Sequence, residues 1–179
     1  MLKSKPNLNG YRDEPKGASH WIYEDHLRSR MRTATSGDVD LRPFSSPRHN
    51  QRSTSSCVGN AVVKSLEIKR IMKHGHDAHV DLSRLAVYYL ARELMFPSET
   101  HRDDGTYISH AFDALRRFGA PLASDWPWDT TKVNSPPSFM AMRNAYLHKI
   151  KAYYKIRSRG QDRVAEVVRC LQAGNPVVF

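Results

Sequence analysis

The segment from Cys57 to about Lys73 constrains the fold most. Apolar residues recur there at the spacing of one helix face, and three more widen that stripe. They are Val58, Ala61, Val62 and Leu66, with Ile68, Ile71 and Met72 beside them. A helix with so wide an apolar stripe has to be covered from several sides. We therefore expect a long, deeply buried central helix that is headed by Cys57 and ends at Gly75.

Four further segments carry helical periodicity, and each is bounded by residues that cap or break helices. One predicted helix starts after Ser83 and ends before Pro97. The others run from Tyr107 to Gly119, from about Ser138 to Ile150, and from after Gln161 to Gly174.

Strand signals are few. Only residues 151–157 (KAYYKIR) and 176–179 (PVVF) are rich in β-branched and aromatic residues. A lone strand leaves its backbone groups unpaired, so these segments predict an incomplete β part beside the helical one. We expect an α+β fold over residues 38–179, preceded by an irregular arm over residues 1–37 with a short helical turn near residues 21–31.

Composition narrows the classes of function. The formal net charge is +10, but the basic residues are scattered, which favours a solvated basic surface over a nucleic-acid site. No apolar run reaches the roughly 18 residues that span a bilayer, and the N-terminus lacks the apolar region of a signal peptide. The two cysteines form no disulfide framework. We expect no membrane contact and a reducing, cytoplasmic location.

Cys57 stands at a predicted helix start, behind small polar residues and six positions after Gln51. The free N–H groups and the dipole of a helix N-terminus favour an anion such as a thiolate, which is the reactive form of cysteine. The Gln51 amide and the Cys57 N–H could then stabilise an oxyanion. The alternative from spacing alone is that Cys57 is a small buried apolar residue.

Residues 39–67 (VDLRPFSSPRHNQRSTSSCVGNAVVKSLE) resemble the start of the mature domain of papain-like (C1-type) cysteine peptidases. In that family a Gln precedes a Cys at the same spacing, and the Cys heads the central helix. LSRLAVYYLARE (82–93) and DDGTYISHAFDALRRFGAPLASDWPWD (103–129) resemble later family segments. The resemblance covers roughly residues 38–179 and implies the nucleophile-bearing portion of the domain.

The resemblance implies roles for six residues. Cys57 would be the nucleophile and Gln51 an oxyanion donor. The backbone at Gly105 and Thr106 would pair with an extended peptide substrate, and Tyr107 and Ile108 would line the pocket for the residue second from the scissile bond. No cofactor or metal is implied. The three histidines in residues 74–79 (HGHDAH) fit no standard zinc spacing.

This sequence departs from the family pattern close to the cysteine. Arg52 and Ser55 replace glycines, Thr54 replaces the extra cysteine of secreted members, and Val58 replaces a tryptophan. The family's catalytic histidine and its orienting asparagine belong after the strand at residues 176–179, so the domain is expected to be truncated before them. None of the nine histidines is assigned as the base.

Two hypotheses follow. One is a cysteine peptidase whose general-base histidine lies outside these residues, with weak or no activity if residues 1–179 act alone. The other is a catalytically inactive papain-like structural or binding module in a larger assembly, such as a virus particle, where the basic arm contacts a partner. The arm is too short for the long helical propeptide of secreted relatives, so no block of that kind is expected.

Overall fold

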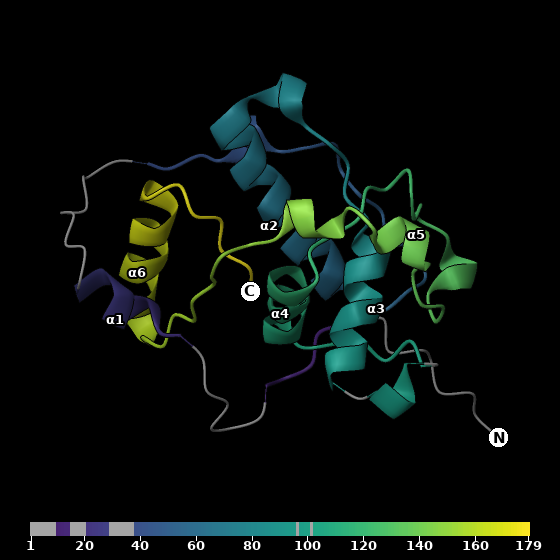
Figure 1. Ribbon diagram of the computed structural model, residues 1–179. Coiled ribbons are helices and arrows are strands. Elements are labelled where there is room, and N and C mark those ends of the chain that lie inside the picture. Colours follow the sequence, from purple (N-terminus) through teal and green to yellow (C-terminus); the bar gives the residue numbers. More distant parts are fainter. Residues whose placement is uncertain (1–9, 15–20, 29–37, 96, 101) are drawn as a thin grey trace.

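The computed structural model describes residues 10–14, 21–28, 38–95, 97–100 and 102–179 (Figure 1). The structure is helix-rich. The α-helices are α1 (Tyr23–Arg28), α2 (Cys57–His74), α3 (Arg84–Met95), α4 (Ile108–Arg117), α5 (Phe139–Met142) and α6 (Gly160–Gln172). Short 3-10 helices are η1 (Arg42–Phe44), η2 (His76–Ala78), η3 (Pro97–Glu99), η4 (Thr130–Lys132) and η5 (Ala145–His148).

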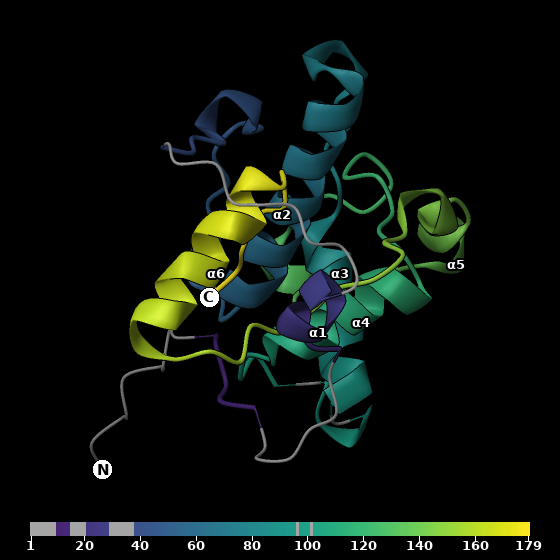
Figure 2. The same ribbon diagram turned by 90° about the vertical axis from the view of Figure 1, so that its left-hand side faces the viewer.

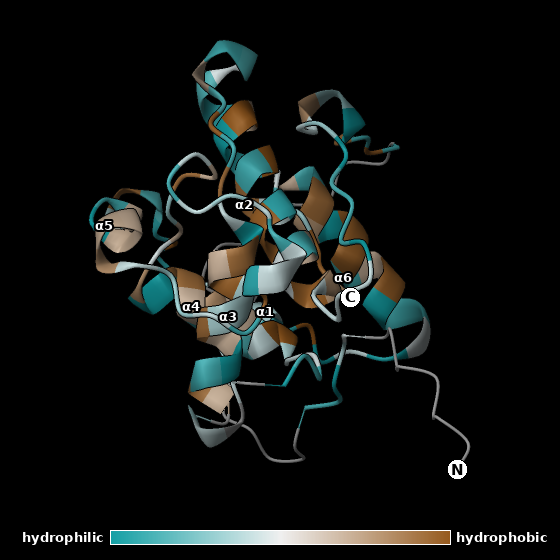
Figure 3. Cartoon of the chain, turned by 90° about the vertical axis from the view of Figure 1, so that its right-hand side faces the viewer, coloured by the Kyte–Doolittle hydropathy of each residue, from teal (hydrophilic) through white to brown (hydrophobic). Residues whose placement is uncertain are grey.

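The core lies where α2, α3 and α4 pack against one another (Figures 1 and 3). Gly59 of α2 lets α3 approach closely, because a Cβ at this position would lie 2.8 Å from the Tyr88 Cβ. Burial of apolar area is the main force that holds such helices together. The buried cluster comprises Val58, Val62, Val63, Leu82, Val87, Leu90, Ala91, Ala111, Ala114, Leu115 and Ala120.

Four of the five predicted helices form close to their expected bounds. The predicted central helix is α2, and Gly75 follows its last residue with a φ of 82°. Ser83 caps α3 as expected, since its Oγ accepts a hydrogen bond from the Ala86 N–H at 3.2 Å. Helix α4 ends before Gly119, which has a φ of 83°, and α6 ends before Gly174, which has a φ of 70°.

The predicted helix from Ser138 to Ile150 is wrong in extent. Only the four residues of α5 are α-helical, and η5 follows as a separate 3-10 helix. Phe139 and Tyr146, two of the apolar residues in the predicted helix, are 83% and 62% exposed. A short helix needs tertiary packing to persist, and these side chains do not receive it.

The predicted strands are also wrong for the described residues, in which only isolated bridges occur. Lys155 pairs in parallel with Ile22, through hydrogen bonds from Lys155 N–H to Trp21 O (2.8 Å) and from Tyr23 N–H to Lys155 O (3.1 Å). Residues 176–179 form no strand. The α+β expectation is therefore met only in its helical part, because an extended segment becomes a strand only with a continuous partner.

The predicted helical turn near residues 21–31 is present as α1, and it packs against α6 (Figure 1). Burial and Cys170 raise the pKa of Tyr23 to about 12. Cys170 is 8% exposed, and burial raises the pKa of its thiol. The two side chains meet in the interior, where α1 contacts α6. Figure 2 shows α6 in front of α2, and Lys69 Nζ of α2 donates to Gly174 O after α6 at 2.8 Å.

In the described parts of the chain, no helix combines the length and the apolar composition that crossing a bilayer requires.

Candidate functional site

Cys57 is the first residue of α2, so its backbone N–H belongs to the free donors of the helix N-terminus. Its side chain is half-buried and touches the apolar core on one side. The turn before it is held by side chains: Ser56 Oγ lies 2.7 Å from Thr54 Oγ1 and accepts from Asn60 Nδ2 at 3.0 Å. Cys57 is therefore partly exposed, and the turn before it is fixed by these hydrogen bonds.

Gln51 lies in the same turn and is half-buried. Its side-chain Nε2 donates to Thr54 O at 2.9 Å, and Thr54 Oγ1 donates back to Gln51 O at 2.8 Å. The amide carries two N–H donors, and one of them is used inside the turn. To stabilise an oxyanion with both, the amide would have to leave the Thr54 carbonyl.

Arg52 has a left-handed backbone, with a φ of 53°. This conformation is costly for a residue with a Cβ and easy for glycine. The papain-like pattern has glycine at this position. The Arg52 N–H donates to Asn50 Oδ1 at 2.7 Å, which helps to hold the strained turn.

Asp103 connects the cysteine turn to the predicted peptide-binding segment. Its carboxylate accepts from Ser55 N–H at 2.9 Å and from the Tyr88 hydroxyl at 2.7 Å. The Tyr88 hydroxyl in turn accepts from Gly105 N–H at 3.0 Å. Tyr88 is fully buried, and burial together with the hydrogen bond to Asp103 raises the pKa of its phenol far above the ordinary value. We refer to these four residues as the Asp103 network.

Sequence reasoning missed Asp103 and Tyr88. Asp103 lies in a family-like segment and Tyr88 in the helix predicted after Ser83, but the sequence predicted no role for either residue. A tyrosine within the apolar stretch at residues 85–91 (LAVYYLA) is the signal that could have found Tyr88, because a buried hydroxyl requires a hydrogen-bond partner.

The predicted substrate-binding backbone at Thr106 is paired with the chain's own N-terminal arm. Thr106 N–H donates to Gly10 O at 2.9 Å, and Arg12 N–H donates to Thr106 O at 3.2 Å. This pairing places Tyr11 parallel to Thr106. Residues 10–12 of the arm therefore cover part of the segment that a peptide was expected to use.

Tight packing holds the arm against the Asp103 network. A Cβ on Gly10 would lie 1.5 Å from Ser55 O, and one on Gly105 would lie 2.4 Å from Gly10 O. Polar contacts extend the attachment: Arg12 Nε donates to Asp104 O at 2.7 Å, and Glu14 accepts from Ser109 N–H at 3.1 Å.

Tyr107 and Ile108, the predicted pocket residues, are half-buried at the start of α4. The Tyr107 ring meets the His110 ring edge-on, with 5.0 Å between centroids. Ile108 packs against the core. Both follow Thr106 directly in the chain, so they border the segment that the arm covers.

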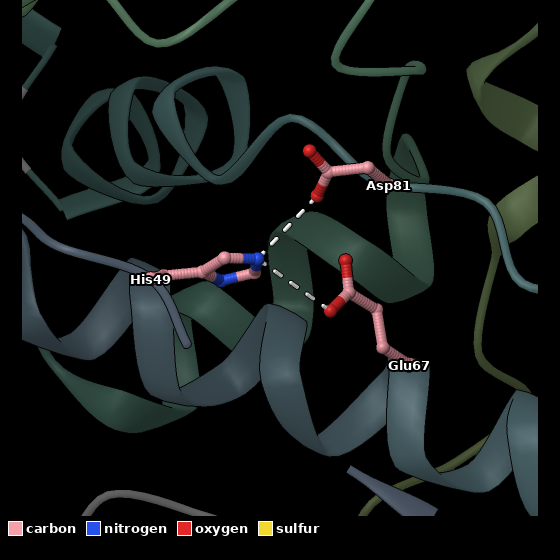
Figure 4. A group of neighbouring side chains, drawn as sticks. All are labelled: His49, Glu67 and Asp81. Carbon is pink, nitrogen blue, oxygen red and sulfur yellow. Dashed lines mark ion pairs between the residues drawn. The ribbon is translucent and has the colours of Figure 1, made fainter. Parts of the chain in front are cut away.

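His49 is two residues before Gln51, yet it faces two carboxylates instead of the cysteine turn (Figure 4). Its Nε2 lies 3.4 Å from Asp81 Oδ1 and 3.9 Å from Glu67 Oε2. Burial, together with the positive charges of Arg84 and Lys64, lowers the pKa of His49 to about 4. Its ring nitrogen is engaged with Asp81 and Glu67.

Comparisons with known proteins bear on the fold. No family model and no curated protein sequence matches the chain. Among solved structures, xylellain, a cysteine protease from Xylella fastidiosa, matches with a TM-score of 0.76 and 22% identity, over 97% of this chain and 67% of that one. A chain from a structural study of the mite allergens Blo t 1 and Der p 1 matches with a TM-score of 0.57 and 13% identity, over 85% of this chain and 47% of that one.

These matches show that the chain has a papain-like fold. Sequence identities below 25% support a shared fold, whereas the chemistry of the site depends on the residues that are present in this chain. The chain spans about two thirds of xylellain and about half of the allergen chain.

Proposed function

We propose that this chain is the nucleophile-bearing part of a papain-like cysteine peptidase. The observation that carries the proposal is the position of Cys57, half-exposed at the N-terminus of α2. The Asp103 network joins its turn to the backbone of Gly105, next to Thr106. A nucleophile and a peptide-pairing segment connected by hydrogen bonds are two of the parts that peptide-bond cleavage requires, and a general base is the third.

In the proposed reaction, the Cys57 thiolate attacks the carbonyl carbon of a peptide bond. The Cys57 N–H and the Gln51 amide stabilise the oxyanion as it forms. The amine then leaves with a proton from a histidine outside these residues, and water hydrolyses the resulting thioester. Residues 10–12 have to leave Thr106 before a substrate can pair there. The Gln51 amide can offer its second N–H to the oxyanion, or both if it turns away from Thr54 O.

The second candidate is an inactive papain-like module that serves in binding or assembly. Two observations favour it: the arm occupies Thr106, and the Gln51 amide donates within its own turn. In this reading the arm is a fixed part of the fold, and Cys57 has no role in catalysis.

A peptide carrying a thiol-reactive electrophile at its C-terminus separates the two candidates. The peptidase predicts selective, saturable modification of Cys57 at neutral pH, with buried Cys170 unmodified, and a slower reaction in Gln51→Ala. Cys57→Ser is the blank. Slow, non-saturable modification that is equal in the Gln51→Ala variant would favour the inactive module.

A further inference from the structure

We propose that His49, Glu67 and Asp81 form a binding site for a divalent transition-metal ion of the Zn²⁺ type. The three side chains come from three segments: the loop before Gln51, helix α2 and the segment before α3. Figure 4 shows the His49 ring directed toward both carboxylates. Imidazole nitrogen and carboxylate oxygen are ligands that suit Zn²⁺, Co²⁺ and related ions.

The spacing suits such an ion. One ligand atom from each residue can be chosen so that all lie within 4.8 Å of one another. A tetrahedral ion with bonds of about 2.0–2.2 Å places its ligand atoms roughly 3.3–3.6 Å apart. The separation of His49 Nε2 from Asp81 Oδ1 is already 3.4 Å, and that from Glu67 Oε2 is 3.9 Å. Only small side-chain movements are needed, and the fourth position stays open to water.

Glu67 forms the rigid floor of the site. Its side chain is fully buried, and it accepts hydrogen bonds from Ser46 Oγ at 2.5 Å and Leu82 N–H at 3.1 Å. Such outer contacts orient a ligand and reduce the entropy that is lost on binding. Asp81 is tied through its backbone, because Ala123 N–H donates to Asp81 O at 2.8 Å. Its side chain is 61% exposed and leaves a path for an ion to enter.

Arg84 and Lys64 are the positive charges near His49 that oppose a bound cation, and Arg84 also interacts electrostatically with Asp81 and Glu67. The Lys64 Nζ lies 4.0 Å from Glu67 Oε2. Its ammonium donates to Ser46 O, Ser46 Oγ and Pro47 O at 3.0, 2.5 and 2.6 Å. These three contacts use all of its N–H donors, so Lys64 contributes charge near Glu67 without occupying the ligand position. A bound ion would therefore add to the contacts of Lys64 instead of replacing them.

A bound ion would also affect the loop that carries Gln51. An ion shared by His49, Glu67 and Asp81 would fasten that loop to α2 and to the start of α3. Metal bound only by the folded state stabilises the fold by mass action. The inference does not depend on proteolysis, because it predicts metal-dependent stability whether or not Cys57 is a nucleophile.

The test has two titrations of the metal-free protein. Zn²⁺ binding is measured through the unfolding temperature, and Co²⁺ binding is measured through visible absorption. We expect one saturable ion per chain, a higher unfolding temperature, and Co²⁺ spectra without the charge-transfer band that a cysteine ligand would add. His49→Ala and Asp81→Asn should each weaken binding by about tenfold or more. Glu67 is left intact, because its loss endangers folding.

The matched control is the double variant His74→Ala/His79→Ala, which removes one exposed and one half-buried histidine of the 74–79 cluster and leaves the proposed ligands in place. It should bind as the unaltered protein does. The proposal is overturned if no saturable binding occurs, if His49→Ala binds equally well, or if binding is lost only in the control variant.

Discussion

Replacing Gly10 with alanine should release the N-terminal arm from Thr106. The new Cβ would lie 1.5 Å from Ser55 O, a separation that two such atoms cannot adopt. Ser55 is held by Asp103 and cannot readily yield, so the arm has to move.

The size of the effect follows from the contacts that are lost. The two backbone hydrogen bonds at Thr106 are those with Gly10 O and Arg12 N–H. Each contributes about 0.5–1.5 kcal/mol net, so the arm loses roughly 1–3 kcal/mol of attachment. At about 1.4 kcal/mol per factor of ten, Thr106 becomes accessible roughly 5 to 150 times more often.

The assay compares two rate constants for alkylation of Cys57. A peptidyl electrophile needs Thr106 for pairing and should react faster in Gly10→Ala by that factor, whereas iodoacetamide needs only the thiol and should change little. Gly160→Ala is the control for a glycine replaced away from the arm: its Cβ would meet no atom within 4 Å, and the backbone strain at its φ of 55° does not involve Thr106. Unfolding curves verify that each variant remains folded.

An unchanged peptide rate in folded Gly10→Ala would refute the reasoning, because the arm would then not limit access to Thr106. An equal rise for iodoacetamide would refute it as well, since that would indicate general loosening around Cys57.

Further outcomes are expected elsewhere in the chain. Leu115→Ala, at a fully buried core position, should lower the unfolding free energy by about 2–5 kcal/mol, whereas Leu147→Ala, at a position 59% exposed, should change it little in denaturant titrations. Arg52→Gly should be neutral or stabilising by up to about 1 kcal/mol, while a valine there should destabilise the protein, because only glycine adopts a φ of 53° without strain. Burial raises the pKa of Glu24, but hydrogen bonds from Ser158 N–H and Arg157 N–H outweigh burial and lower the pKa below the ordinary value. The ionised carboxylate therefore adds to the unfolding free energy fully above the ordinary pKa, and this contribution is lost as the pH falls through the lowered pKa. Glu24→Gln should reduce the loss of unfolding free energy over that acid range. Lys64→Met should tighten Zn²⁺ binding several-fold by removing a positive charge beside Glu67, and weaker binding would count against the proposed site.

The sequence alone determined the main helices and the candidate nucleophile. Apolar periodicity and capping residues are local signals, so α2, α3, α4 and α6 could be predicted closely, and Cys57 was placed correctly at the start of α2. The extent of the helix expected to reach Ile150 could not be judged in this way, because its persistence depended on packing that Phe139 and Tyr146 do not receive.

Only the tertiary structure decided which distant residues meet. Asp103 joins Ser55 to Tyr88, the arm at Gly10 covers Thr106, and His49 turns toward Glu67 and Asp81. No spacing in the chain encodes these contacts. They arise when helices bury their apolar faces together, and the polar groups brought to the edges of that core then find partners far away in sequence, because an unpaired polar group costs free energy wherever water is excluded.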